Sequence, residues 1–180
     1  MDSMLVGRAA EREAIAAALR SLPERRGVVI TVEGEPGIGK SRLLAHLAQT
    51  AATTCTVLEA RASEFESDVP YALFTEALDW QPAEPADRHQ THRALREELE
   101  RRARGRPLVL VLDDVHWADP ASVDALAALI RRPPAAAVML AIAARERQIP
   151  PHLAAALAGA MREDRVVGVT PGPLLALIHI

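Results

Sequence analysis

A glycine-spaced turn between an apolar run and a helical pattern narrows the possible folds of this chain more than any other segment. Residues 28–41 read VVITVEGEPGIGKS, in which β-branched residues precede Gly34 and the turn closes on Gly39, Lys40 and Ser41. Glycines at this spacing let successive backbone N–H groups converge on one anion, because no Cβ obstructs the approach. We therefore predict a strand, a phosphate-binding loop and a helix, in that order.

The sequence holds a single lysine, and it stands at the end of this turn. Arginine supplies all the other permanently charged basic side chains. An ammonium group is a compact charge on a flexible stem, so we predict that Lys40 reaches the β- and γ-phosphates of a nucleotide. The Ser41 hydroxyl is predicted to bind Mg²⁺, and the amides of Gly37, Ile38 and Gly39 to contact phosphate oxygens. The alternative is a glycine-rich turn with an incidental Lys-Ser pair.

Strand-like and helix-like segments alternate along the rest of the chain, as a parallel sheet with crossover helices requires. Strands are predicted at 28–32, 56–60, 108–112, 137–143 and 165–169, and helices at 9–19, 40–51, 69–80, 87–104, 120–130 and 151–161. The run 108–112 is apolar throughout, which is typical of a strand covered on both faces. The fold class is therefore predicted as α/β with a five-stranded parallel sheet.

Length, charge and cysteine content exclude several classes of protein. A chain of 180 residues suits one domain, which we place at 1–173, with 174–180 as an apolar tail that is truncated, foreign or a buried last strand. The net charge of −3 gives no general attraction for nucleic acid or an acidic membrane, and the arginines of 87–104 are interpreted as partners of neighbouring glutamates. No run of about 20 apolar residues is available to cross a bilayer. Cys55 is alone, so we expect a cytoplasmic protein without an internal disulfide.

Two acids follow the most apolar strand. Asp113 and Asp114 come directly after 108–112, at the carboxyl edge of the predicted sheet, where ligands bind in such folds. We predict that Asp113 holds Mg²⁺ through water and that Asp114 orients or deprotonates the attacking water. The alternative is that the two acids only end the strand and cap the next helix.

Further side chains are predicted near the same edge. Arg145 follows the fourth strand and is a candidate for neutralising the γ-phosphate, although its neighbours Glu146 and Arg147 make a surface ion-pair cluster the alternative. His116 and Trp117 either belong to a loop that transmits the nucleotide state or form a tryptophan anchor beside a solvated histidine. The other histidines show no metal-ligand spacing with the lone cysteine, so no zinc site is predicted.

Three segments taken together resemble the STAND class of P-loop ATPases. They are Leu5-Val6-Gly7-Arg8, the loop from Gly34 to Ser41, and the run from Val111 to Asp119, which reads VLDDVHWAD. The sequence looks most like the ATPase domain of large ATP-binding LuxR-type transcriptional regulators, over residues 4 to about 173. The run that ends in HWAD, with a VGR upstream, is far more specific than the phosphate loop alone.

The resemblance implies an ASCE-type P-loop NTPase fold, a three-layer sandwich whose sheet has the order 5-1-4-3-2, here without the helical lid that family members commonly append. It also implies adenine contacts near Val6, Gly7 and Arg8, with ATP and Mg²⁺ as ligands. The catalytic candidates are Lys40, Asp114 and Arg145, and the metal candidates are Ser41 and Asp113. The nucleotide-binding candidates are Val6, Gly7, Arg8, Gly34, Pro36, Gly37, Ile38, Gly39, Lys40, Ser41 and Arg42.

One functional hypothesis accounts for these motifs: an ATP-binding and slowly hydrolysing nucleotide switch within a signal-responsive transcriptional regulator. ATP and ADP are its expected ligands, self-association on ATP binding is a further candidate interaction, and DNA is expected to be contacted only through a domain absent from this chain. No membrane contact is expected. The alternatives are an AAA+-like motor ATPase of the helicase or remodelling type, or a truncated fragment that binds nucleotide weakly.

Overall fold

The strands form one parallel sheet in a computed structural model that describes residues 8–83, 87–145 and 147–171. The order across the sheet is β2-β3-β4-β1-β5. This is the predicted order 5-1-4-3-2 read from the opposite edge, so the α/β P-loop fold class is confirmed. The strands are β1 (Val28–Gly34), β2 (Thr56–Arg61), β3 (Leu108–Asp113), β4 (Val138–Arg145) and β5 (Val166–Val169).

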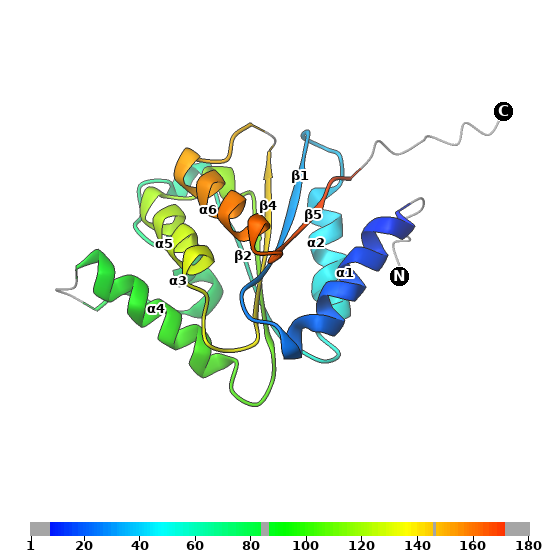
Figure 1. Cartoon of the computed structure of the whole chain (residues 1–180). Coiled ribbons are helices and arrows are strands. Elements are labelled where there is room, and N and C mark those ends of the chain that lie inside the picture. Colours follow the sequence, from blue (N-terminus) through cyan, green and yellow to red (C-terminus); the bar gives the residue numbers. More distant parts are fainter. Residues whose placement is uncertain (1–7, 84–86, 146, 172–180) are drawn as a thin grey trace.

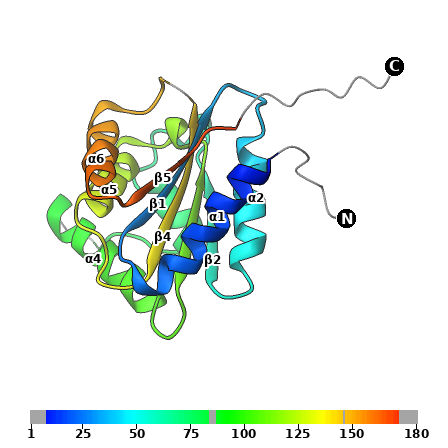
Figure 2. The same cartoon turned by 45° about the vertical axis from the view of Figure 1, so that its right-hand side comes forward.

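Helices cover both faces of the sheet (Figure 1). On one face lie α1 (Ala9–Ser21) and α2 (Lys40–Ala51), which Figure 2 shows side by side. On the other face lie α3 (Ala72–Leu78), α4 (Arg88–Arg102), α5 (Pro120–Arg131) and α6 (Pro151–Arg162). Three short 3₁₀ turns complete the elements: η1 (Leu22–Glu24), η2 (Glu64–Glu66) and η3 (Val115–Trp117). The result is the predicted three-layer sandwich.

The position of β3 inside the sheet explains why polar and apolar residues do not alternate in its sequence. Leu108, Leu110 and Leu112 pack into the hydrophobic cluster under α3 to α6, whereas Val109 and Val111 pack into the cluster under α1 and α2. Successive side chains point to opposite faces, and both faces are covered, so every position must be apolar. The lone Cys55 is buried in the α1–α2 cluster, as an ordinary small core residue.

Helix α3 is shorter than the segment 69–80 that the sequence predicted. It is bounded by two residues with left-handed backbone, Tyr71 at φ 61° and Asp79 at φ 48°. The N–H groups of Tyr71 and Ala72 donate to the carboxylate of Asp119, which lies far along the chain. The helix therefore begins after Pro70, at a point set by a distant cap that no local pattern could indicate.

The glutamate partners predicted for the arginines of α4 are present for part of the helix. Arg93 pairs with Glu97 at 2.8 Å, and Glu98 accepts from both Arg101 and Arg102 at 2.6 Å. Arg96 occurs in none of the ion pairs found in the described part of the chain. The pairing prediction is therefore confirmed for Arg93, Arg101 and Arg102, but not for Arg96.

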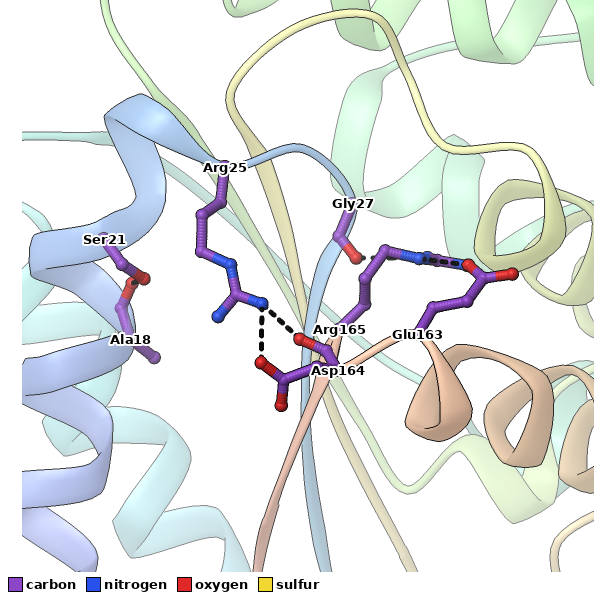
Figure 3. Close-up of polar contacts among 7 residues, drawn as sticks. All are labelled: Ala18, Ser21, Arg25, Gly27, Glu163, Asp164 and Arg165. Atoms are coloured by element: carbon purple, nitrogen blue, oxygen red, sulfur yellow. Dashed lines mark hydrogen bonds and ion pairs between the residues drawn. The ribbon is translucent and has the colours of Figure 1, made fainter.

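Two arginines join the amino ends of the neighbouring strands β1 and β5 (Figure 3). Arg25, just before β1, donates to the backbone carbonyl of Asp164 and lies 3.4 Å from its carboxylate. Arg165, just before β5, donates to the carbonyl of Gly27 at 3.3 Å and pairs with Glu163 at 2.7 Å. These contacts hold the four-residue strand β5 in register with β1, whose opposite end carries the phosphate loop.

Candidate nucleotide-binding site

The phosphate loop joins β1 to α2 at the carboxyl edge of the sheet. Gly39 is the residue before α2 and has φ 100°, a left-handed conformation that side chains rarely adopt. A Cβ at this position would also lie 3.1 Å from Nη2 of Arg8. Glycine is therefore required here both for the backbone turn and for the close approach of a guanidinium. The turn directs the first N–H groups of α2 outward, as an anion site requires.

Lys40 lies inside the loop and is 7% exposed. Its Nζ donates to the carbonyl oxygens of Gly34 at 2.9 Å and Glu35 at 3.0 Å. These two bonds hold the ammonium at the mouth of the loop, where its third donor remains for another acceptor. The Lys40 ammonium is therefore already positioned to donate to a bound phosphate. The carbonyl oxygens of Gly34 and Glu35 would compete with the phosphate for this ammonium.

Arg8 packs against the loop from the side of α1. It is 3% exposed, and its Nη2 donates to the carbonyl oxygen of Ile38. Its Nε and Nη1 are buried and have no hydrogen-bond partner among the described residues. A buried guanidinium with open donors suits an anionic or purine ligand. Val6 and Gly7, the other two residues expected at the adenine, lie outside the described residues.

The remaining loop candidates surround this centre. Ser41 and Arg42 are exposed in the first turn of α2, Pro36 and Gly37 are exposed at the tip of the loop, and Ile38 is half-buried. Gly34 is the last residue of β1, and a Cβ there would approach Ile38 to 3.0 Å. The structure thus places these residues in one continuous loop, while the ligand role of each stays a prediction.

The two acids after β3 have different surroundings. Asp113 Oδ1 accepts a hydrogen bond from the N–H of Asp114 at 2.8 Å. Asp114 has left-handed backbone at φ 52°, and its Oδ2 accepts from Nε of Arg61 at 2.9 Å and from Nη2 at 2.7 Å. These contacts raise the pKa of Arg61, chiefly through its hydrogen bond to Asp114. The candidate base is therefore held by an arginine that the sequence analysis missed.

The strand pairing explains how Arg61 reaches this position. β2 and β3 are parallel neighbours, and the register pairs Arg61 with Asp113. Both strands end at the same edge, so a charged residue at the end of β2 must face the acids after β3. The sequence could have indicated that Arg61 lies near these acids. Arg61 comes one residue after the predicted strand 56–60, and the predicted strand order puts that strand beside 108–112.

Arg145, His116 and Trp117 meet beside the acids. The guanidinium carbon of Arg145 lies 5.5 Å from the centroid of the Trp117 ring, and the His116 and Trp117 rings are 5.2 Å apart. Both ring nitrogens of His116 are buried without a partner among the described residues, so the interpretation of His116 as solvated is wrong. Glu146, a member of the alternative ion-pair cluster, lies outside the described residues.

Electrostatic effects on His116 show how closely the predicted site residues gather. Burial is the largest cause lowering the pKa of His116, and the positive charges of Arg145 and Lys40 lower it further. The carboxylates of Asp114 and Asp113 act in the opposite direction. Lys40 of the phosphate loop, both acids and Arg145 therefore all influence the pKa of His116.

Asp119 is the last residue of the VLDDVHWAD run, and the sequence indicated no role for it. In the structure it is a structural acid. It is 2% exposed, and its carboxylate accepts N–H bonds from Tyr71 at 2.9 Å, Ala72 at 3.2 Å and Ser122 at 2.8 Å. It caps α5 and at the same time fixes the start of α3. Asp119 thus connects the segment after β3 to the segment after β2. Arg61 is the last residue of β2.

Replacing Asp119 by alanine should lower the free energy of unfolding by about 3 kcal/mol, because one buried and two half-buried N–H donors lose a charged acceptor. Urea denaturation measures the change. Asp87→Ala is the matched control: Asp87 is an exposed cap on α4 with one hydrogen bond, from Gln90 N at 2.8 Å, and its loss should be worth about 1 kcal/mol. Equal losses for the two variants would contradict the proposed joining role.

Comparison with known proteins identifies the family. The AAA ATPase domain family matches residues 4–142, which is more than half of the chain. The chain therefore belongs to the AAA ATPase domain family, and the matched residues include the phosphate loop and the acids after β3. A search of curated protein sequences gave no match.

Solved structures with the same fold include replication proteins. Orc1 of Aeropyrum pernix, solved in complex with DNA, is 20% identical with a TM-score of 0.64, over 94% of this chain and 46% of that one. Cdc6p of Pyrobaculum aerophilum is 20% identical with a TM-score of 0.63, over 92% and 46% respectively. A DNA replication initiation factor is 16% identical with a TM-score of 0.58, over 93% and 48%. These similarities establish the P-loop NTPase fold, and the chain spans about half the length of each protein.

Two further findings concern membrane-spanning helices and metal-binding groups among the described residues. None of the helices among them is long and apolar enough to cross a membrane. No group of histidine, cysteine or acidic side chains in the same ranges is arranged to hold a metal ion by itself.

Proposed function

We propose that this AAA ATPase domain is a nucleotide switch, which binds Mg·ATP and hydrolyses it slowly within a signal-responsive transcriptional regulator. The single observation that carries the switch role is the Arg61–Asp114 pair. The carboxylate of Asp114, which we propose activates water, lies 2.7 Å from the guanidinium of Arg61, an arrangement suited to slow turnover. The regulator context is supported by the VGR and HWAD segments of the sequence.

In this proposal each part of the site has a distinct task. The loop amides and Lys40 bind the phosphates, and the Ser41 hydroxyl and the free oxygen of Asp113 hold Mg²⁺, directly or through water. When bound there, Mg²⁺ would neutralise the negative charge that develops on the phosphates during transfer. Asp114 orients the attacking water, and Arg145 moves from the Trp117 ring toward the γ-phosphate. Arg8 closes the side of the loop where the purine is expected.

The experiment that tests this function is a pair of measurements on the same protein. Calorimetric titration with Mg·ATP should give saturable binding, and steady-state turnover should remain well below the 1–100 s⁻¹ typical of kinases. Rapid, sustained hydrolysis by the isolated chain would favour the motor-type alternative and contradict the switch. Self-association on ATP binding, measured by sedimentation with and without nucleotide, belongs to the same proposal, whereas DNA contact is assigned to a domain outside this chain.

Asp113 provides a prediction specific to the metal. Asp113→Asn should weaken ATP binding in the presence of Mg²⁺ by about tenfold, since a carboxylate ligand becomes a neutral amide. Binding of ATP in EDTA should change little, because Asp113 is not expected to touch the phosphates directly. Titrations with and without Mg²⁺ measure the difference. An equal loss in both conditions would show that Asp113 supports the fold of the edge and not the metal.

A further inference from the structure

A large groove lies between α4 and α5 and shares no lining residue with the phosphate loop. Its volume is about 610 Å³, within the range of about 300–1,000 Å³ that is usual for ligand sites. Five arginines and two histidines line it, with Asp124 as the one acid in its wall. Both helices belong to the layer opposite α1 and α2 (Figure 1). The groove is thus a separate and strongly basic feature of the domain.

Contacts at both ends hold the two walls of the groove in place. Near the start of the helices, Nη1 of Arg88 on α4 lies 3.1 Å from Oδ2 of Asp124 on α5. Near their ends, Oε1 of Glu100 on α4 accepts from the N–H of Ala135, which follows α5, at 2.7 Å. Residues 88–96 of α4 line one side of the groove, and residues 124–132 at α5 line the other. A space whose walls are fixed at both ends is already formed for a ligand.

The protein compensates the positive charge of the groove only in part, because Arg88 pairs with Asp124 and Arg93 with Glu97. Asp124 is already shared between Arg88 and Nε2 of His152, the latter at 3.0 Å. Within the described ranges, none of the ion pairs includes Arg96, Arg131 or Arg132. Like charges gathered from two helices repel each other, so the arrangement is unfavourable unless an anion joins it.

His92 lies in the wall of the groove and responds to this field. Its Nε2 is buried without a partner among the described residues. Burial is the main cause lowering its pKa, and Arg88, His89 and Arg131 lower it further, whereas Asp124 acts to raise it. The pKa of His92 therefore reports the net influence of the charges around the groove.

From this geometry we infer that the α4–α5 groove binds a compact multivalent anion, a group that presents several phosphates or carboxylates to Arg96, Arg131 and Arg132. Guanidinium groups bind both kinds of oxygen acid through paired hydrogen bonds. A long nucleic acid fits less well, because the basic face of α4 from Arg88 to Arg96 extends only about 12 Å. The net charge of −3 on the chain also opposes a long polyanion.

The test uses His92 as a local reporter. The pKa of His92 is followed by NMR of histidine-labelled protein, with His92→Gln to assign the signal, in a Lys40→Ala background that removes phosphate binding at the loop. Tripolyphosphate and citrate are the two probes, and each is titrated separately. A bound anion should raise the pKa of His92, because negative charge near the ring favours its protonated form. A response to tripolyphosphate alone assigns phosphate chemistry, and a response to citrate assigns carboxylates.

Matched variants separate the groove from the overall charge of the protein. Arg131→Gln with Arg132→Gln should weaken anion binding by about tenfold or more. Arg12→Gln with Arg26→Gln removes the same charge from exposed positions elsewhere and should leave the affinity unchanged. Equal weakening by both pairs, or a His92 titration that neither anion moves, would overturn the inference. So would a response confined to single-stranded oligonucleotides, with affinity rising with their length, because the groove would then be part of a nucleic-acid surface.

Discussion

Replacing Lys40 by alanine is expected to abolish the stabilisation of this protein by Mg·ATP. A ligand at 100 times its Kd stabilises the folded state by about 2.7 kcal/mol, which corresponds to a rise in Tm of roughly 5–10 °C for a domain of this size. Lys40 is the one lysine in the sequence, and its Nζ already lies within 3.0 Å of two loop carbonyls. Without it the triphosphate loses the charge that the loop directs toward it, and the shift should fall to near zero.

Two further substitutions distinguish loss of the charge from collapse of the loop. Lys40→Met keeps the buried aliphatic stem and removes the ammonium, so it should behave like Lys40→Ala toward nucleotide while packing as the native side chain does. Lys40→Arg keeps the charge, but a planar guanidinium does not fit between the carbonyls of Gly34 and Glu35, and we expect no rescue. Thermal shift assays with and without Mg·ATP give both results. A full nucleotide-dependent shift in Lys40→Met would show that the phosphates are held elsewhere.

The sequence predicted the fold well because its signals were local and periodic. Residues close together in the sequence determine the main features of the fold. These features are the apolar strand β3, the glycine loop before α2 and the alternation of strands with helices. The order of the strands came from the family resemblance and agrees with the structure. The limits of α3 could not be predicted in the same way, because they depend on the carboxylate of Asp119, which is 47 positions beyond Ala72.

The candidate site was predictable where a motif carried it, and not where tertiary contacts decide the chemistry. Lys40, Asp113 and Asp114 stand in patterns whose spacing fixes their place at the sheet edge. Arg61 stands in no such pattern, and its importance arises only when β2 and β3 pair in register. The basic α4–α5 groove is a similar case: neither helix shows it alone, because the arginines of α4 have glutamates beside them in the sequence.

Replacing Asp114 by asparagine is expected to reduce ATP turnover by a factor on the order of 10²–10⁴, the usual contribution of a general base. Binding of Mg·ATP should stay within a few-fold, since the proposed role of Asp114 is to orient the attacking water and not to hold the phosphates. Single-turnover hydrolysis and calorimetric titration measure the two quantities. A variant that loses binding and turnover together would place Asp114 among the ligand contacts instead.

The Arg61–Asp114 pair makes a second and opposite prediction. Arg61→Gln should raise turnover, by at most about fivefold, because an exposed charge pair is worth about 1 kcal/mol or less and its loss frees Oδ2 for water. The Arg61 side chain is 68% exposed, so its removal should not disturb the core. In the double variant with Asp114→Asn the gain should vanish, since Arg61 then has no carboxylate to restrain. If Arg61→Gln instead lowered turnover as far as Asp114→Asn does, Arg61 would act on the nucleotide itself, and the pair would be a catalytic contact and not a restraint.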